Sequence, residues 1–251
     1  MAHEVQDHYF RQAKREGYLS RAAYKLIEID DRKRLLRHGD WVLDCGAAPG
    51  SWLQVAAKRV GARGVIVGID RRPITHHFEH GNIRLIEGDL TQTPATLLLQ
   101  LAQDGGSGPS SSAEVRRGGS GPACGRDRMR LFDCVLSDMA PTTSGDRTTD
   151  HHLSVRLCHT VLDCCAEVLR PGGHLVMKVF EGEAYPELVA RARRLFETLK
   201  GFVPKASRPQ STEIYIVARK FRGPGAEQST LSHFELDQPP RRRPSRGWGD
   251  G

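Results

Sequence analysis

Four strand-like runs of the sequence end in an aspartate, whose carboxylate can bind ribose or an amino group. These residues are Asp44, Asp70, Asp89 and Asp138. Because the carboxyl ends of parallel strands meet at one edge of a sheet, we expect the four carboxylates to lie near one another. There Asp70 can accept hydrogen bonds from two ribose hydroxyls, and Asp89 from an adenine amino group. Each aspartate alone could equally be a turn or cap residue, but the four together predict a site for an adenosine-containing ligand.

A glycine-rich turn follows the first of these strands and precedes a helix-like segment. It reads Asp44-Cys-Gly46-Ala-Ala-Pro-Gly50-Ser-Trp52. Glycines let a ligand approach the backbone, and the free N–H groups of the following helix can bind it, although a plain strand-to-helix turn would use the same residues. The turn is neither the GxGxxG dinucleotide motif nor the GxxxxGK[ST] triphosphate motif. NAD and S-adenosylmethionine both fit such a site, and the glycine spacing favours the methyl donor.

Strand-like runs alternate with amphipathic segments from Trp41 onward. The expected strands are 41–44, 64–70, 83–89, 132–138, 174–180 and 213–218, with a further one beginning at Phe202. The expected helices between them are 51–60, 93–102, 151–169 and 186–199, and a turn is expected at 171–173. This alternation predicts an α/β fold with a mostly parallel sheet and helices on both of its faces.

The remaining segments suggest how the chain is divided. Residues 1–40 are expected to form an N-terminal helical extension, with Ser20 as the N-cap of a helix over 21–29. Residues 41–221 are expected to form the main domain, with a flexible Gly/Ser/Arg-rich insertion at 104–130. Residues 222–251 are rich in proline and arginine, and we expect a disordered tail.

Net charge and cysteine content indicate the kind of partner that the chain binds and the compartment in which it acts. The 251 residues carry a formal net charge of +7, which favours a polyanionic partner such as nucleic acid. No apolar run approaches the ~20 residues that cross a bilayer, and no secretory signal is visible. The six cysteines form no CxxC pair, which favours a reduced, cytoplasmic chain. We expect a monomer, no membrane partner and no metal, although histidines cluster at 76–80 and 151–152.

Six short strings, in order along the chain, together resemble one known family. They are Ser20-Arg-Ala-Ala-Tyr-Lys25-Leu-Ile-Glu28, Leu43-Asp-Cys-Gly-Ala-Ala-Pro-Gly-Ser-Trp52, Ser137-Asp-Met-Ala-Pro141, Pro171-Gly-Gly173, Lys178-Val-Phe-Glu-Gly182 and Ser211-Thr-Glu-Ile-Tyr215. Over roughly residues 9–221 the chain is similar to the FtsJ/RrmJ family of ribosomal RNA 2′-O-methyltransferases. It departs from the family at Thr142, where asparagine is common, in the 104–130 insertion and in the basic tail.

The resemblance implies a fold, a reaction and a set of site residues. The fold would be that of a Rossmann-like class I S-adenosylmethionine-dependent methyltransferase with a seven-stranded sheet. The substrate would be a uridine 2′-hydroxyl in the A loop of large-subunit (23S) ribosomal RNA, within the 50S subunit. By motif, the catalytic residues would be Lys25, Asp138, Lys178 and Glu213. The cofactor-binding residues would be Gly46, Gly50, Trp52, Asp70, Asp89 and Asp138.

The residue types of this catalytic set suit proton removal from a hydroxyl. Lys178 can act as a general base only when it is neutral, and burial or a neighbouring cation such as Lys25 favours the neutral amine. Asp138 would favour the charged form but can orient the side chain, and Glu213 could hold either lysine. Without the resemblance, Lys178 could point outward from an edge strand, Lys25 could be a solvated helix residue, and Glu213 could simply start a strand.

Basic residues recur in two regions that we expect near the proposed site and that could bind RNA phosphates. They are Arg11, Lys14, Arg15, Arg21, Arg32, Lys33, Arg34 and Arg37, and then Arg191, Arg193, Arg194, Lys205 and Arg208. Interleaved acids make an ordinary solvated surface an equal alternative. Tyr9, Tyr18 and Tyr24 could stack on an exposed base or could pack in the core.

Three rival functions remain. A nicotinamide-dependent oxidoreductase would use the same fold, but the missing GxGxxG motif and the two lysines argue against it. A non-catalytic RNA-binding or ribosome-assembly protein would not need the Lys-Asp-Lys-Glu set. The same methyl transfer could also act on tRNA or another RNA, because substrate choice depends on surface shape and charge.

Overall fold

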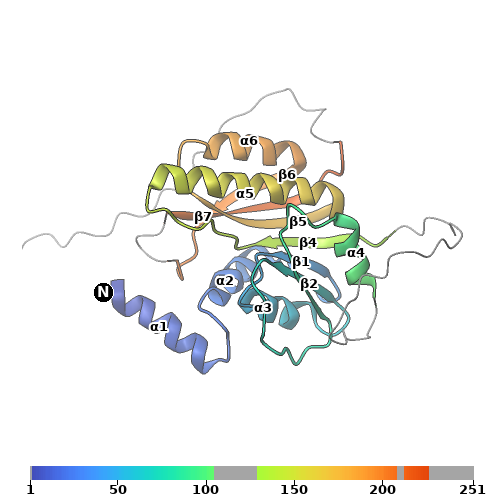
Figure 1. Cartoon of the computed structure of the whole chain (residues 1–251), viewed down its shortest axis with the longest axis horizontal. Coiled ribbons are helices and arrows are strands. Elements are labelled where there is room, and N and C mark those ends of the chain that lie inside the picture. The colour runs from blue at the N-terminus through green and yellow to red at the C-terminus, as the bar shows by residue number, and fades with distance from the viewer. Residues whose placement is uncertain (1, 105–128, 208–211, 226–251) are drawn as a thin grey trace, which may run out of the picture.

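Seven strands form one sheet, with helices on both of its faces (Figure 1). The computed structural model describes residues 2–104, 129–207 and 212–225. The predicted insertion at 104–130 and the predicted tail at 222–251 lie almost entirely outside these residues. The strands are β1 (Trp41–Cys45), β2 (Val65–Asp70), β3 (Ile83–Glu87), β4 (Phe132–Ser137), β5 (Leu169–Phe180), β6 (Phe196–Phe202) and β7 (Glu213–Phe221). The helices are α1 (Ala2–Arg15), α2 (Ala23–Lys33), α3 (Ser51–Val60), α4 (Ala95–Gln103), α5 (Arg147–Val168) and α6 (Tyr185–Leu195).

The strand order is β3-β2-β1-β4-β5-β7-β6. β1 to β5 run parallel to one another, whereas β7 is antiparallel to both β5 and β6. The sheet is therefore mostly parallel, as predicted. Because β7 runs against β5, its first residues lie beside the carboxyl end of β5, and Glu213 pairs with Phe180.

Two apolar cores lie between the layers of the molecule, one on each face of the sheet. One packs α4, α5 and α6 against a face of the sheet through side chains such as Leu98, Leu162 and Leu188. The other packs α2 and α3 against the opposite face through Leu26, Ile29 and Leu53. Helix α1 contacts the rest through Ala13, which packs with Tyr24 of α2. The central strands β1, β2, β4 and β5 are therefore buried on both faces over most of their length, which explains their apolar runs, whereas the outer strands β3 and β6 are more exposed.

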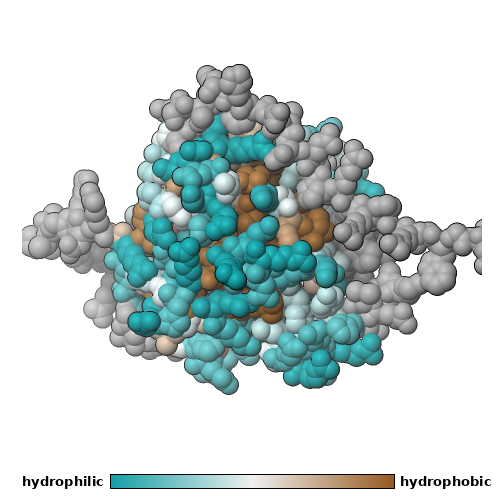
Figure 2. Space-filling view, turned by 180° about the vertical axis from the view of Figure 1, so that it is seen from behind, coloured by the Kyte–Doolittle hydropathy of each residue, from teal (hydrophilic) through white to brown (hydrophobic). Residues whose placement is uncertain are grey.

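The described surface is largely polar. Hydrophilic side chains cover most of the face turned away from Figure 1, and hydrophobic ones show only in patches (Figure 2). None of the described helices is long and apolar enough to span a membrane. The same residues contain no cluster of three or more His, Cys, Asp or Glu side chains that could hold a metal ion.

Two predictions about local structure are wrong. The sixth strand was expected to begin at Phe202, but it ends there and begins at Phe196, so α6 stops at Leu195 rather than at residue 199. Phe196 is buried against Phe221, with ring centroids 5.4 Å apart, and pairing with β7 makes this segment extended despite its helical pattern. The expected turn at 171–173 falls inside the bounds of β5, where residues 170–173 have no partner on β4 and Gly172 has a φ angle of 78°, so the strand bulges there.

Ser20 is not an N-cap, because α2 begins only at Ala23 and its first residue has no side-chain cap. The Ser20 hydroxyl instead accepts a hydrogen bond from the Ala22 N–H at 3.2 Å and donates one to Ser51 Oγ at 2.9 Å. The serine therefore links the segment before α2 to the first residue of α3. That long-range contact has no local sequence signal.

Candidate active site

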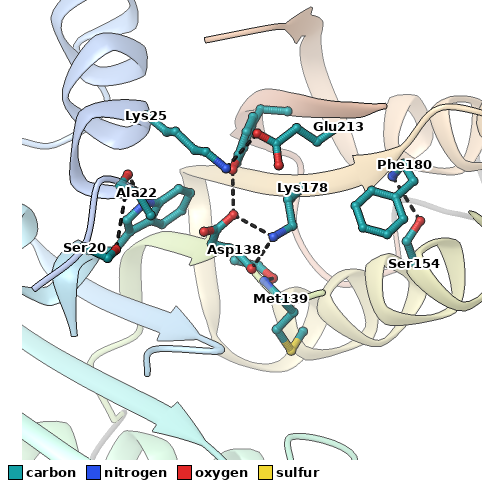
Figure 3. A network of polar contacts seen from close by, with 12 residues as sticks. Ser20, Ala22, Lys25, Asp138, Met139, Ser154, Lys178, Phe180 and Glu213 are labelled. Atoms are coloured by element: carbon teal, nitrogen blue, oxygen red, sulfur yellow. Dashed lines mark hydrogen bonds and ion pairs between the residues drawn. The ribbon is translucent and has the colours of Figure 1, made fainter. Parts of the chain in front are cut away.

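The four predicted catalytic residues meet at the carboxyl edge of the parallel strands. Asp138 directly follows β4, and Lys178 lies near the end of β5. Glu213 begins β7 and is brought to the same edge by the antiparallel pairing of β5 with β7. Lys25 lies in the first turn of α2, the helix that packs over this part of the sheet. Residues that are far apart in the sequence therefore form one cluster (Figure 3).

Two lysine–carboxylate pairs make up this cluster. Lys178 Nζ lies 2.9 Å from Asp138 Oδ1 and donates a hydrogen bond to the Asp138 carbonyl at 2.7 Å. Lys25 Nζ lies 2.7 Å from Glu213 Oε1. Lys25, Lys178 and Glu213 each have a side chain that is 9% exposed, whereas that of Asp138 is 19% exposed. The burial of both side chains therefore excludes the alternative interpretations, an outward-pointing Lys178 and a solvated Lys25.

Tyr215 joins the two pairs, and the sequence analysis did not include it in the site. Its hydroxyl donates a hydrogen bond to Asp138 Oδ1 at 2.6 Å, and Lys25 Nζ lies 5.6 Å from the centre of its ring. Burial, followed by the negative charges of Asp138 and Glu213, raises its pKa well above the ordinary value. The hydroxyl therefore stays protonated and remains a donor. Its position two residues after Glu213 on a strand, which puts both side chains on one face, was the available signal.

The lysines also control the charge of the two carboxylates. Burial opposes ionisation of Asp138, but the cations Lys178 and then Lys25, together with the Tyr215 hydrogen bond, hold its pKa below the usual value. Burial likewise opposes ionisation of Glu213, and Lys25 overcomes it and lowers the pKa. Both carboxylates are therefore anionic at neutral pH.

The start of α5 holds the two loops that flank Asp138 and Lys178. Asp150 accepts hydrogen bonds from the backbone N–H of Ser144 at 2.7 Å and of Gly145 at 3.3 Å. His151 contacts the Phe180 carbonyl through Nδ1 at 2.8 Å and accepts from the Ala184 N–H through Nε2 at 2.9 Å. These contacts fix the chain directly after β4 and β5. The paired histidines at 151–152 thus include one that positions a loop.

The glycine turn lies next to this cluster, after β1. Gly46 and Gly50 have φ angles of 79° and 112°, which L side chains rarely adopt. A Cβ atom at Gly46 would lie 2.4 Å from Met139 Cγ, and one at Gly50 would lie 2.6 Å from Phe78 Cζ. Both glycines are thus required by the turn and by the packing of the chain itself.

Trp52 connects the turn to the catalytic helix. Its side chain is buried, and its indole Nε1 donates a hydrogen bond to the Ala22 carbonyl at 2.9 Å. Its ring lies 5.9 Å from that of Tyr215, measured between centroids. In this structure Trp52 therefore holds the start of α2, and with it Lys25, against the sheet.

Asp70 and Asp89 lie at the ends of β2 and just beyond β3. Asp70 accepts hydrogen bonds from the N–H groups of Ala48 at 2.9 Å and Arg72 at 2.8 Å. Asp89 accepts from the N–H of Thr91 at 2.9 Å and from its hydroxyl at 2.7 Å. Both carboxylates therefore stabilise turns, which was the alternative interpretation of each. A carboxylate has about four acceptor positions, so each can also bind a ligand.

Asp44 was expected among the four strand-end carboxylates, but not among the cofactor-binding residues that the resemblance implied. It lies on β1, its side chain is fully buried, and neither of its carboxylate oxygens has a hydrogen-bond partner in the described part of the chain. Burial, and then the nearby charges of Asp138 and Asp70, raise its pKa well above the ordinary value. Buried polar atoms are nearly always paired, so an unpaired carboxylate beside a glycine turn indicates that a ligand donor belongs there.

This burial predicts how stability depends on pH. The raised folded-state pKa means that ionising Asp44 opposes folding, so the chain loses stability as the pH rises above the unfolded value of about 3.9. Asp44→Asn removes this charge. We expect the free energy of unfolding of the ligand-free variant to exceed that of the native chain at pH 8, by about 1–3 kcal/mol, and the difference to shrink in acid.

Urea unfolding between pH 5 and pH 9 measures this difference. Asp146→Asn is the matched control, because hydrogen bonds to Thr149 lower the Asp146 pKa, so this carboxylate is ionised in the folded and the unfolded chain throughout the range and its replacement should give a difference that does not change with pH. A constant difference between the native chain and Asp44→Asn over this range would contradict the assignment of an ionisable, unpaired Asp44.

The three tyrosines at the N-terminal side form a cluster with one another. The rings of Tyr9 and Tyr18 lie 5.5 and 5.7 Å from that of Tyr24, which is buried. Lys58 Nζ lies 4.3 Å from the centre of the Tyr18 ring. Of the two interpretations, stacking on an RNA base or packing in the core, the burial of Tyr24 supports packing in the core.

Fold and site together define a class of protein. A mostly parallel seven-stranded sheet with an antiparallel β7, and an acidic and glycine-rich site at the carboxyl ends of β1 to β4, is the architecture of a Rossmann-like methyltransferase. The family model for FtsJ-like methyltransferases matches residues 18–221. The chain belongs to this family, as the resemblance predicted.

Individual relatives agree with this assignment. Ribosomal RNA large subunit methyltransferase E of Syntrophobacter fumaroxidans is 43% identical over 88% of this chain and 99% of its own length. The protein of the same name from Halobacterium salinarum is 39% identical over 85% of this chain and 73% of its own. A crystal structure of a protein described as a ribosomal RNA methyltransferase from Plasmodium falciparum superposes with a TM-score of 0.65 at 26% identity, covering 82% of this chain and all of the other.

Proposed function

We propose that the chain transfers a methyl group from S-adenosylmethionine to the 2′-hydroxyl of a uridine in the A loop of large-subunit (23S) ribosomal RNA. The observation that carries this proposal is the buried Lys178–Asp138 pair beside the Lys25–Glu213 pair, next to the glycine turn. The names of the relatives supply the RNA class. We further propose that the substrate is the 50S subunit and that the chain acts as a cytoplasmic monomer.

The residues around the glycine turn fit this cofactor. Asp44 has two buried carboxylate oxygens without partners, which suit the positively charged end of the molecule. Asp70 and Asp89 keep acceptor positions for ribose hydroxyls and an adenine amino group. When bound, S-adenosylmethionine supplies a methyl group on a cationic sulfur that can be displaced in line by an oxygen.

The lysines and carboxylates would prepare the oxygen for this displacement. A 2′-hydroxyl must lose its proton as the new O–C bond forms, and Lys178 Nζ in its neutral form can accept that proton. Asp138 and its own carbonyl then hold the resulting ammonium, as their 2.9 and 2.7 Å contacts allow. Lys25 provides a second cation within the same cluster, held by Glu213, and can stabilise the developing negative charge on oxygen.

The proposal is tested by methyl transfer from labelled S-adenosylmethionine to three RNA substrates. These are 50S subunits lacking the modification, free large-subunit rRNA and tRNA. We expect label in the large-subunit rRNA and none in tRNA. Transfer to tRNA alone would overturn the substrate, and cofactor binding without transfer to any RNA would favour the non-catalytic RNA-binding alternative.

A further inference from the structure

A basic cavity lies at the edge of the sheet opposite to the active site. It has a volume of about 970 Å³, and six of its lining residues are basic: Arg32, Lys33, Arg34, Arg37, Arg59 and Arg219. Arg37 precedes the amino end of β1, and Arg219 pairs with His174 at the amino-end side of β5. Arg219 lies six positions after Glu213 on β7, so the cavity lies about 20 Å from the catalytic cluster along that strand. The expectation that the basic residues at 32–37 lie near the active site is therefore wrong.

Much of the positive charge in this cavity is not neutralised. Its two acidic residues, Asp30 and Asp31, both contact Arg59, and Asp30 also accepts the N–H groups of Leu35 and Leu36. Arg32 lies 3.0 Å from Glu28. The other four basic residues have no ion-pair partner in the part of the chain that the structure describes; they are Lys33, Arg34, Arg37 and Arg219. An ordinary solvated face with interleaved acids would pair more of them.

The pKa of His174 is affected by the basic side chains of this region. The residue is largely buried and lies between the basic side chains at this edge. Burial, followed by the positive charges of Arg219, Arg37 and Arg170, lowers its pKa to about 4. The histidine is therefore neutral at physiological pH. A neutral residue at this position adds no charge to the cavity, whereas the surrounding arginines keep theirs.

Arg34, which lines the cavity, lies at a backbone position where glycine would make the folded chain more stable. Arg34 caps the end of α2 with φ 51° and ψ 59°, in the left-handed region. Glycine is the usual residue at this position, because it has no Cβ to strain the turn. The sequence thus keeps a charged side chain at a position where it costs stability. Such a departure from local preference is typical of a residue retained for binding.

We propose that this basic cavity binds the phosphate backbone of a second segment of the substrate RNA, away from the target nucleotide. The proposal rests on the proposed function for the identity of that RNA. Unpaired arginines next to a concave surface suit phosphate groups, which accept paired N–H bonds from guanidinium. A second contact about 20 Å from the catalytic lysines would let the enzyme select a folded large-subunit RNA over a short strand with the same target sequence.

A pair of charge-neutralising variants tests this contact. Arg37→Gln/Arg219→Gln removes two cavity charges, and Arg84→Gln/Arg156→Gln removes two charges from β3 and α5, neither of which lines the cavity. Binding to full-length large-subunit rRNA is measured over a series of KCl concentrations. We expect the cavity variant to bind roughly tenfold more weakly near physiological salt, with a log–log salt slope shallower by about 1–2. The control variant should match the native chain.

Three further measurements keep the outcome interpretable. S-adenosylmethionine affinity and melting temperature of the cavity variant should be unchanged, which excludes misfolding. Arg34→Gly should raise the melting temperature and yet weaken RNA binding, which a purely structural role could not produce. In methylation of 50S subunits, KM should rise with kcat unchanged.

The results can also overturn the proposal independently of the proposed reaction. If RNA binding is weakened equally in the cavity and control variants, the effect is only the general attraction between a basic protein and RNA, and the proposed second contact is wrong. An unchanged affinity and salt slope in the cavity variant would remove the second contact altogether. Because binding is read without turnover, either result stands even if no RNA is methylated.

Discussion

Replacing Lys178 by alanine is expected to lower kcat for methyl transfer by a factor of about 10²–10⁴, the usual contribution of a general base. The side chain is buried, and no other lysine contacts Asp138 in the described cluster. Its removal therefore leaves no group to accept the hydroxyl proton. S-adenosylmethionine affinity should change little, because Lys178 is not among the expected cofactor-binding residues and all of those residues, Asp138 included, are retained. Single-turnover kinetics and cofactor titration separate the two effects.

A charge-preserving variant distinguishes a base from a structural cation. Lys178→Arg keeps the positive charge next to Asp138, but arginine does not deprotonate in proteins, so it should be nearly as inactive as alanine. Substantial activity of Lys178→Arg would show that Lys178 only orients the substrate.

Breaking the buried Lys25–Glu213 pair is expected to destabilise the fold as well as the reaction. Glu213→Gln leaves the Lys25 ammonium without its counterion in a site that is 9% exposed, which typically costs about 3–5 kcal/mol. The melting temperature should fall by on the order of 10 °C. The lowered pKa of Glu213 fixes the pH dependence: the pair stabilises the native chain above the ordinary glutamate range, and this stabilisation is lost as the pH falls through the folded-state pKa.

A double substitution separates stability from catalysis. Lys25→Met/Glu213→Leu replaces both charges by apolar groups of similar size, so no buried ion is left unpaired, and the free energy of unfolding should return close to the native value. Methyl transfer should remain low, because the second cation of the cluster is gone. Recovery of activity together with stability would show that the pair acts only as a structural element.

The sequence predicted the central sheet well because its strands are long apolar runs bounded by turns. Strands that are buried on both faces need such apolar runs, and a run of this kind can be recognised in each segment of the sequence alone. The edge strand β6 was misplaced because only its end residues, Phe196 and Phe202, are buried, so this short segment has no alternating pattern that would distinguish it from the end of a helix. Pairing with β7, a segment more than ten residues away, decided its conformation.

The site was predictable where the chemistry follows from residue type and missed where it depends on packing. Lys25, Asp138, Lys178 and Glu213 were recognised through the resemblance, and the antiparallel β7 explains why they meet. Tyr215 resembled an ordinary aromatic strand residue, and Asp44 was expected among the strand-end carboxylates without any sign that its two oxygens lack hydrogen-bond partners. Their roles appear only when burial and hydrogen-bond partners are known, because an unpaired carboxylate is a property of the folded chain.

The most direct test of the central claim is the chemical position of the transferred methyl group. A 2′-O-methyl group blocks alkaline cleavage of the adjacent phosphodiester bond, because the neighbouring hydroxyl is no longer free to attack. After reaction with unmodified 50S subunits, we predict one alkali-resistant bond at a uridine of the A loop, absent with Lys178→Ala. A methyl group on a base, or resistance that persists in the Lys178→Ala reaction, would contradict ribose methylation by this lysine-based site.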